Sequence, residues 1–205
     1  MYVSVEDTFK YIPDLPSGGL IEFGVLNGNH LSELIKWSTD NNCPFTAVIG
    51  CDSWKGIPLE AEGVFKNPDW PQGVFNSRID FKVDTDEECI AAVEKKIYSA
   101  VPKEQCPNLR WVSGFFSDSL TEGLGKELYN TISYAHIDCD LYISSSQCLD
   151  WLFRYSVLKE GSIIRFDDWA STPANGGQKL AWKQIKEKYQ ITSFQSLADN
   201  VFKLC

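Results

Sequence analysis

The stretch YAHIDCDLY, residues 134–142, decides the fold of this chain. Its apolar beginning predicts a short buried strand over residues 132–137, and acids follow at the end of that strand. A second run of the same shape, SIIRFDDW, occupies residues 162–169. Residues 144–157 lie between the two runs and carry apolar side chains at helical spacing. The sequence therefore predicts a strand, a helix and a second strand.

Strands joined in this way lie parallel and side by side, because the crossover through the helix is right-handed. Their carboxyl ends meet at one edge of the sheet, which is where open α/β folds bind ligands. We therefore expect Asp138, Asp167 and Asp168 to converge. Three neighbouring carboxylates repel each other unless a cation or a shared proton offsets their charge. Mg²⁺ is the ion that suits such a set of oxygen ligands.

A glycine-bearing turn follows the first predicted strand, residues 20–24. Gly24 and Gly28 allow the backbone to turn sharply and to approach a ligand closely, and residues 30–38 continue with helical spacing. The turn contains neither G-x-G-x-x-G nor the Lys-Ser/Thr of a phosphate loop. This pattern favours a nucleoside ligand that lacks phosphate, and a plain strand-to-helix turn is the alternative interpretation.

Two further strands are predicted, over residues 45–52 and 109–113. The first ends in Asp52, where α/β folds bind the two hydroxyl groups of a ribose. Gly114, Phe115 and Phe116 follow the second strand and predict an adenine slot in which one of the rings stacks. Core packing is the alternative for each ring.

Residues 59–80 are rich in Pro, Gly, Asn and Trp. A loop of this length inside a compact domain is usually functional or mobile. We interpret it as a lid with Trp70 and Phe75 as covers, and a disordered insertion is the alternative.

The remaining segments complete the prediction of one α/β domain over residues 1–205, with a mostly parallel seven-stranded sheet and helices on both faces. Helices are expected over residues 5–12, 86–100 and 178–189. Residues 191–196 and 200–204 alternate like an antiparallel hairpin at the sheet edge.

Composition argues against several partners. A net charge of −9 disfavours binding to nucleic acid or to an anionic membrane surface. No apolar run approaches the roughly 20 residues that span a bilayer, and the first residues lack a signal-peptide pattern. The 7 cysteines contain no Cys-x-x-Cys, which indicates reduced thiols and a cytoplasmic location, or the host cytoplasm for a viral protein. Zinc is disfavoured because no cysteine pair has ligand spacing.

Five blocks of the sequence resemble the motifs of the macrocin O-methyltransferase family, in that family's order. They are LIEFGV with the following Gly28, then GCDSWKGIP, SGFF, HIDCDLY and FDDW, which begin at residues 20, 50, 113, 136 and 166. The resemblance covers most of the chain. The second and fourth blocks are the specific ones, whereas the glycine turn alone would be a weak signal.

The resemblance implies the class I methyltransferase fold, which is Rossmann-like. It further implies an enzyme that uses S-adenosyl-L-methionine and Mg²⁺ to methylate a hydroxyl group of a sugar within a glycan or glycoside. Asp138, Asp167 and Asp168 match the metal-binding acids of the family. The residues expected to bind the cofactor are Glu22, Gly24, Val25, Gly28, Asp52, Ser53, Gly114, Phe115 and Phe116.

The chain departs from the family at its N-terminus, which is shorter than in typical members. Their additional helices serve as lids and oligomer contacts. The acceptor and the formation of a homo-oligomer therefore stay open. The chain is also compatible with the methyltransferase module of a multidomain glycosyltransferase, viral or bacterial.

Methylation of a hydroxyl group requires a group that accepts its proton. Asp138 and His136 are the candidates, because alternate residues of a strand share a face. A structural, hydrogen-bonded role is the alternative for His136. Asp140 is expected to cap the helix that begins near Ser144.

Three other functions are alternatives to this interpretation. A catechol-type O-methyltransferase also uses Mg²⁺ and a diol, but its aromatic acceptor requires an apolar slot. A nucleotide-dependent oxidoreductase is disfavoured because G-x-G-x-x-G is absent. A non-catalytic cofactor-binding module of a glycan-building protein is disfavoured because it would not need three clustered acids.

Overall fold

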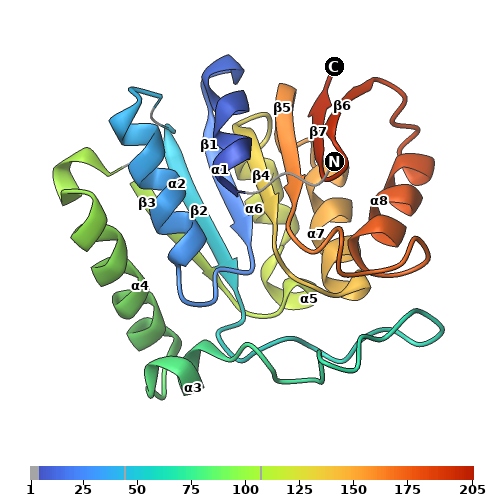
Figure 1. Cartoon of the computed structure of the whole chain (residues 1–205), viewed down its shortest axis with the longest axis horizontal. Helices are drawn as coiled ribbons and strands as arrows, with labels where there is room; N and C mark the ends of the chain where they lie inside the picture. The colour runs from blue at the N-terminus through green and yellow to red at the C-terminus, as the bar shows by residue number, and fades with distance from the viewer. Residues whose placement is uncertain (1–4, 44, 107) are drawn as a thin grey trace.

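A computed structural model describes residues 5–43, 45–106 and 108–205. Within these ranges the chain forms a seven-stranded sheet with the order β3-β2-β1-β4-β5-β7-β6 (Figure 1). Strands β1 to β5 are parallel, whereas β7 runs antiparallel to both β5 and β6. The predicted α/β class and the C-terminal antiparallel hairpin are confirmed. The strands are β1 Gly19–Phe23, β2 Ala47–Asp52, β3 Asn108–Ser113, β4 Ile132–Ile137, β5 Leu158–Phe166, β6 Phe194–Ala198 and β7 Val201–Leu204.

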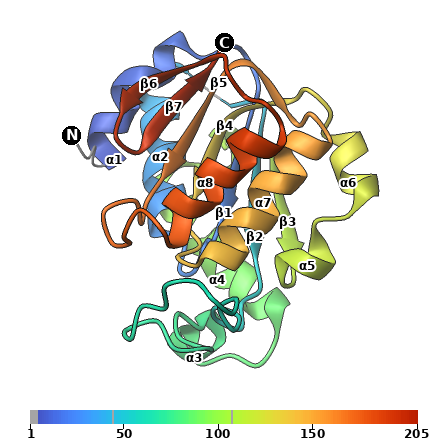
Figure 2. The same cartoon turned by 90° about the vertical axis from the view of Figure 1, so that its right-hand side faces the viewer.

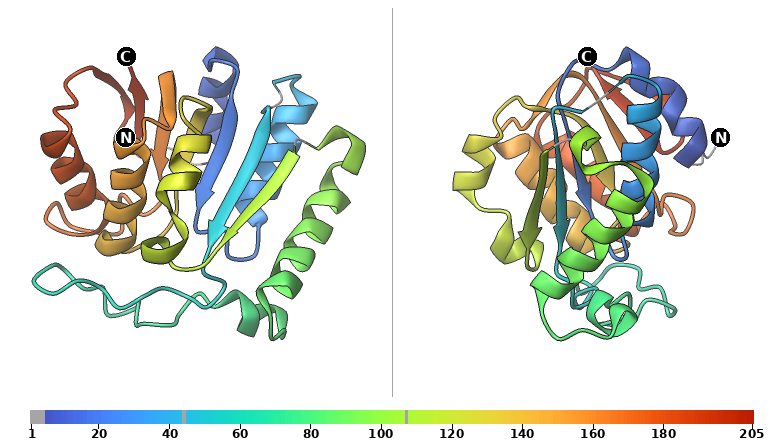
Figure 3. Two further views of the ribbon diagram at one scale, coloured as in Figure 1. Left: turned by 180° about the vertical axis from the view of Figure 1, so that it is seen from behind. Right: turned by 90° about the vertical axis from the view of Figure 1, so that its left-hand side faces the viewer.

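Helices cover both faces of the sheet (Figures 2 and 3). One face packs on α2 Asn29–Asp40 and α4 Asp86–Ala100, and the other on α6 Glu122–Glu127, α7 Tyr142–Arg154 and α8 Gly177–Lys188. Successive strand residues alternate between these two cores, as Leu20 and Ile21 do. The shorter helices are α1 Val5–Thr8, η1 Phe9–Asp14, α3 Ser77–Phe81, η2 Lys103–Gln105 and α5 Phe116–Ser119.

The central strands meet closely where β1 and β4 end. Gly24 has φ +91°, and a Cβ atom built on it would lie 1.7 Å from the carbonyl oxygen of Asp138. A side chain at this position would therefore push the two strand ends apart. Gly24 thus serves the approach of one backbone to another.

An irregular segment, residues 53–76, crosses the carboxyl edge of the sheet, and we call it the arm (Figures 1 and 2). The Glu60 carboxylate accepts hydrogen bonds from the backbone N–H groups of Tyr142 (2.8 Å) and Ile143 (3.0 Å) at the start of α7. Farther along, Phe65 packs against Gly176, where an added Cβ would lie 2.6 Å from the Cβ of Phe65. These two contacts attach the outer part of the arm to the domain. The loop predicted over residues 59–80 ends earlier, because residues 77–81 form α3 with Asn76 as its cap.

All seven cysteines lie in the described ranges, and each is free. Among the helices of those ranges, none combines the length and the apolar character that a bilayer span requires.

Candidate active site

A cavity of about 470 Å³ opens at the carboxyl edge of the sheet. Six residues predicted to bind the cofactor line it: Gly24, Asp52, Ser53, Gly114, Phe115 and Phe116. Leu26, Gly56, Ile57, Pro58, Phe75, Ser117, Asp138, Cys139, Asp140, Ile143, Ser144 and Gln147 complete the wall. The cavity therefore lies where the crossover of β4 and β5 placed it in the sequence prediction. Of the two predicted lid covers, Phe75 belongs to the wall and Trp70 does not.

Asp52 joins the glycine turn to the end of β2. Its Oδ2 accepts hydrogen bonds from the backbone N–H groups of Val25 and Leu26, both at 2.8 Å, and its Oδ1 accepts one from Trp54 at 2.6 Å. Burial raises the pKa of Asp52, and these three N–H donors oppose that rise. Oδ2 thus accepts two donors and Oδ1 only one, so Oδ1 can still accept a hydroxyl donor from the cavity.

The other residues predicted from the glycine turn shape it from outside the cavity wall. Gly28 is the left-handed N-cap of α2, with φ 71°, and an added Cβ would lie 2.6 Å from Cγ1 of Val93. Val25 is buried and contributes its N–H to Asp52. Glu22 is only 1% exposed and lies below the turn on β1.

The two predicted adenine-slot rings differ in their surroundings. Phe116 packs edge-on against Phe23, with ring centroids 5.6 Å apart, while also lining the cavity. Phe115 lines the cavity and is half-buried. Core packing therefore accounts for part of the Phe116 surface, whereas Phe115 lines the cavity without a ring partner among the described residues.

The predicted acids gather at the ends of β4 and β5. One donor atom from each of Asp138, Asp167 and His136 lies within 4.8 Å of the others. Asp168 lies outside this group, and its Oδ2 accepts hydrogen bonds from the N–H of Asp140 (3.1 Å) and from Nε2 of Gln178 (3.0 Å). The structure thus brings two of the three predicted metal ligands together directly.

Burial makes this acidic cluster strongly self-repelling. The pKa of Asp138 is raised well above its usual value by burial and then by the charges of Asp167 and Asp168. Burial followed by Asp168 raises the pKa of Asp140 to about 8, and burial followed by Asp167 raises the pKa of Asp168 to about 7. A divalent cation relieves this kind of repulsion, and carboxylate oxygens are the ligands that Mg²⁺ prefers. The residues present therefore fit such an ion.

Asp140 does not cap α7, contrary to the sequence prediction. Helix α7 begins at Tyr142 with Leu141 as its N-cap, and no side chain of the cap residue contributes. Asp140 instead has φ 57° and lines the cavity. Glu60 of the arm binds the free N–H groups of the helix, which leaves the Asp140 carboxylate facing the site.

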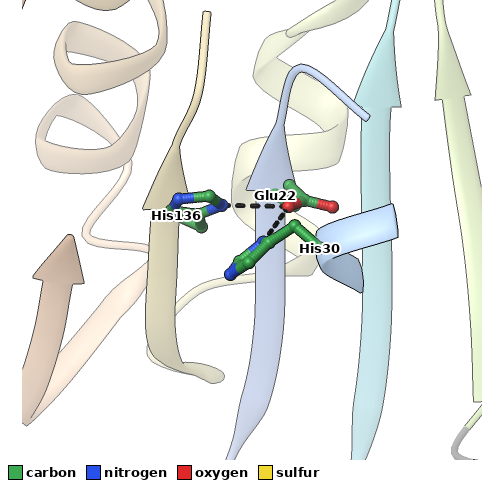
Figure 4. A group of neighbouring side chains, drawn as sticks. All are labelled: Glu22, His30 and His136. Atoms are coloured by element: carbon green, nitrogen blue, oxygen red, sulfur yellow. Dashed lines mark hydrogen bonds and ion pairs between the residues drawn. The ribbon is translucent and has the colours of Figure 1, made fainter. Parts of the chain in front are cut away.

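Beneath the acids lies a buried polar row, formed by Glu22, His136 and Arg165. These residues pair side by side across β1, β4 and β5. Arg165 donates from Nη1 to Nε2 of His136, so this nitrogen is the acceptor and Nδ1 carries the proton. Nδ1 of His136 then donates to Oε1 of Glu22 at 2.9 Å. His30 of α2 donates from its Nδ1 to the same oxygen (Figure 4).

The contacts of His136 in the polar row bear on whether it can accept a proton from the acceptor hydroxyl group. Its side chain is fully buried and lies outside the cavity wall, and burial lowers its pKa. The geometry matches the hydrogen-bonded structural alternative, and among the two predicted proton acceptors Asp138 is the one that faces the cavity. Glu22, His30 and His136 are close enough to surround a metal ion, but the protonated Nδ1 of His136 is not available as a ligand.

Sequence reasoning missed three residues that shape this site. Arg165 carried a signal, because a charged residue inside an apolar strand, two positions before Asp167, needs a buried partner. The sequence signal for His30 was weaker, because it is only a polar residue in the first turn of a helix. Glu60 carried none, because its contact with α7 joins segments more than 80 residues apart.

No family model matches the sequence, and no curated protein matches it. Among solved structures, the O-methyltransferase NovP is similar over 98% of this chain and 78% of its own, with 20% identity and a TM-score of 0.67. The calicheamicin methyltransferase CalS11 is similar over 98% and 76%, with 19% identity and a TM-score of 0.65. CmcI, in a structure named for Mg and SAM, is similar over 97% and 69%, with 12% identity and a TM-score of 0.50.

The chain has the fold of the class I methyltransferases. At these identities the likeness concerns the fold alone, so the activity is argued from the site.

Proposed function

We propose that this protein is an S-adenosyl-L-methionine- and Mg²⁺-dependent O-methyltransferase that acts on a hydroxyl group of a sugar. The observation that carries the proposal is a single cavity bounded by Gly24 and Asp52 on one side and by Asp138 and Asp140 on the other. A nucleoside site and a carboxylate cluster therefore share one space, as methyl transfer to a chelated hydroxyl group requires.

The side chains divide the work by position. Asp52 accepts hydrogen bonds from the ribose hydroxyl groups, and Phe115 supplies an apolar surface for the base. Asp138, Asp167 and Asp168 would hold the metal ion, which when bound acts as a Lewis acid toward the acceptor oxygen. Asp138 and Asp140 face the cavity, so a carboxylate there receives the acceptor proton.

The sugar acceptor rests on the sequence motifs and on the names of similar proteins, one of which is described as a TDP-rhamnose 3'-O-methyltransferase. An aromatic diol is the second candidate, because Ile57, Pro58 and Phe75 give the cavity an apolar wall. Mass spectrometry of glycosides and catechols incubated with methyl-labelled cofactor separates the two acceptors. Labelled catechols without labelled glycosides would replace the sugar assignment.

The role of the acids is tested by Asp138→Asn. We expect turnover to fall by more than about 100-fold, because the variant loses a metal ligand and a carboxylate that faces the acceptor. Calorimetry should show S-adenosylhomocysteine binding close to that of the wild type. Asp80→Asn, on the exposed surface of α3, is the matched control. Full turnover of the wild type in excess EDTA would contradict the metal role.

A further inference from the structure

The polar row lies one step behind the acids on the same face of the sheet. Side chains of a strand alternate between faces, so residues two apart share one. Moving two positions along each strand from Glu22, His136 and Arg165 leads to Gly24, Asp138 and Asp167. The buried row therefore lies directly below Asp138, which lines the cavity, and Asp167 beside it.

Arg165 is the cation of this support, and it is fully buried. Its Nε donates to Oγ1 of Thr8 at 3.1 Å, and its Nη1 donates to Oδ1 of Asp167 at 2.8 Å. Nη1 also donates to Nε2 of His136. A guanidinium held from three sides has little freedom to rotate, and it transmits that fixed orientation to the carboxylate of Asp167.

His136 sets the position of Arg165 by accepting its hydrogen bond, and Glu22 holds His136 in the tautomer that can accept it. Oε2 of Glu22 has no hydrogen-bond partner among the described residues. The other Glu22 oxygen is shared between His136 and His30, so the carboxylate orients two imidazoles at once (Figure 4).

We propose that Arg165, locked in place by His136, is a positioning residue that fixes the Asp167 carboxylate for a divalent ion. The inference rests on the proposed function, because it assigns a role to residues behind the proposed metal ligands. With Oδ1 held by the guanidinium, Oδ2 of Asp167 has a defined direction.

The positive charge of Arg165 opposes a nearby cation, so the balance of charge must be considered. Four carboxyl groups gather here, from Asp138, Asp140, Asp167 and Asp168, against one guanidinium. The surplus of acid favours a divalent ion even with Arg165 in place. Burial alone would raise the pKa of Asp167, but the guanidinium of Arg165, which donates to its Oδ1, holds that pKa below its usual range.

Direct metal binding tests this role. Mn²⁺ replaces Mg²⁺ as the probe, free Mn²⁺ is measured by electron paramagnetic resonance, and S-adenosylhomocysteine affinity is measured by calorimetry on the same samples. Arg165→Lys keeps the positive charge but loses the planar guanidinium and its several N–H donors, so we expect Mn²⁺ affinity to fall by about 10–100-fold. S-adenosylhomocysteine affinity should stay within about threefold. Arg110→Lys, in an exposed pair with Glu127, is the matched control.

A second pair of variants keeps the test decisive if Arg165→Lys folds poorly. Glutamine at position 136 offers an oxygen to Arg165 and an N–H to Glu22, whereas leucine offers neither. We expect His136→Gln to retain Mn²⁺ affinity and His136→Leu to lose it, with circular dichroism confirming that both are folded.

The outcomes separate the two proposals. A wild-type protein that binds no Mn²⁺ would overturn the metal-dependent function and this inference with it. A wild type that binds Mn²⁺ while the Arg165 and His136 variants bind it equally well would overturn the inference alone.

Discussion

At the scale of single residues, Asp140 shows how burial and neighbouring carboxylates disfavour a charged side chain in the site. It faces the cavity with φ 57°, and burial together with Asp168 raises its pKa to about 8. Because the pKa of Asp140 is higher in the folded than in the unfolded state, its contribution to the free energy of unfolding is present at low pH and is lost as pH rises through 8. At pH 9 in EDTA, Asp140→Asn should raise Tm by about 2–4 °C, which corresponds to about 1 kcal/mol. Asp80→Asn is the control, and an unchanged or lower Tm for Asp140→Asn would contradict the repulsion.

His30 gives the opposite dependence on pH. Burial, followed by the charge of Arg165, lowers the pKa of His30 to about 3 from an ordinary value of 6.5. Its contribution to stability is complete above pH 6.5 and is lost as pH falls toward 3, by up to about 1.4 kcal/mol per pH unit. His30→Gln retains a donor for Glu22 and cannot titrate. Urea unfolding at pH 7, 6 and 5 should therefore show a shallower acid loss in this variant, and an identical slope would refute the assignment.

At the scale of elements, one carboxylate attaches the arm to α7. Glu60 accepts two N–H groups at the start of α7, as a capping residue does. Glu60→Ala should cost about 1 kcal/mol and should let the arm detach more often, so trypsin should cleave after the exposed Lys66 several-fold faster. Glu62→Ala, on an exposed arm residue, is the control. Equal cleavage rates for the two variants would show that Glu60 does not hold the arm.

The elements also show how far local sequence signals reach. The predicted strand over 132–137 and helix over 86–100 match β4 and α4 residue for residue. An apolar run defines the first, and a capping box between Thr85 and Glu88 starts the second. Helices α5 and α6 span only 4 and 6 residues, too short to leave a periodic pattern.

Within the site, the acids were predictable because the crossover of β4 and β5 brings strand ends together. The polar row was not, because its contacts depend on which residues of β1, β4 and β5 pair. Glu60, in place of Asp140, accepts from the first N–H groups of α7, and this contact likewise depends on where a distant loop lies.

At the scale of the whole molecule, ligand binding and stability are linked. A ligand that binds only the folded state stabilises it by about 2.7 kcal/mol at a concentration 100 times its Kd. Mg²⁺ at that level should raise Tm by about 5–10 °C. Asp138→Asn should remove most of this shift, whereas Asp80→Asn should retain it. Differential scanning calorimetry with equal ionic strength in all samples measures the effect, and an equal shift in both variants would place the ion elsewhere.

The polar row bears on how the sheet assembles. Apart from the polar row, β1 and β4 are mostly apolar, and they could slide by two residues without turning any side chain to the other face. Such a slip would separate Arg165 from His136 and His136 from Glu22, and an unpaired buried charge costs about 3–5 kcal/mol. A sheet with a shifted register is therefore less stable than the native one, and Glu22, His136 and Arg165 help to select the native strand register.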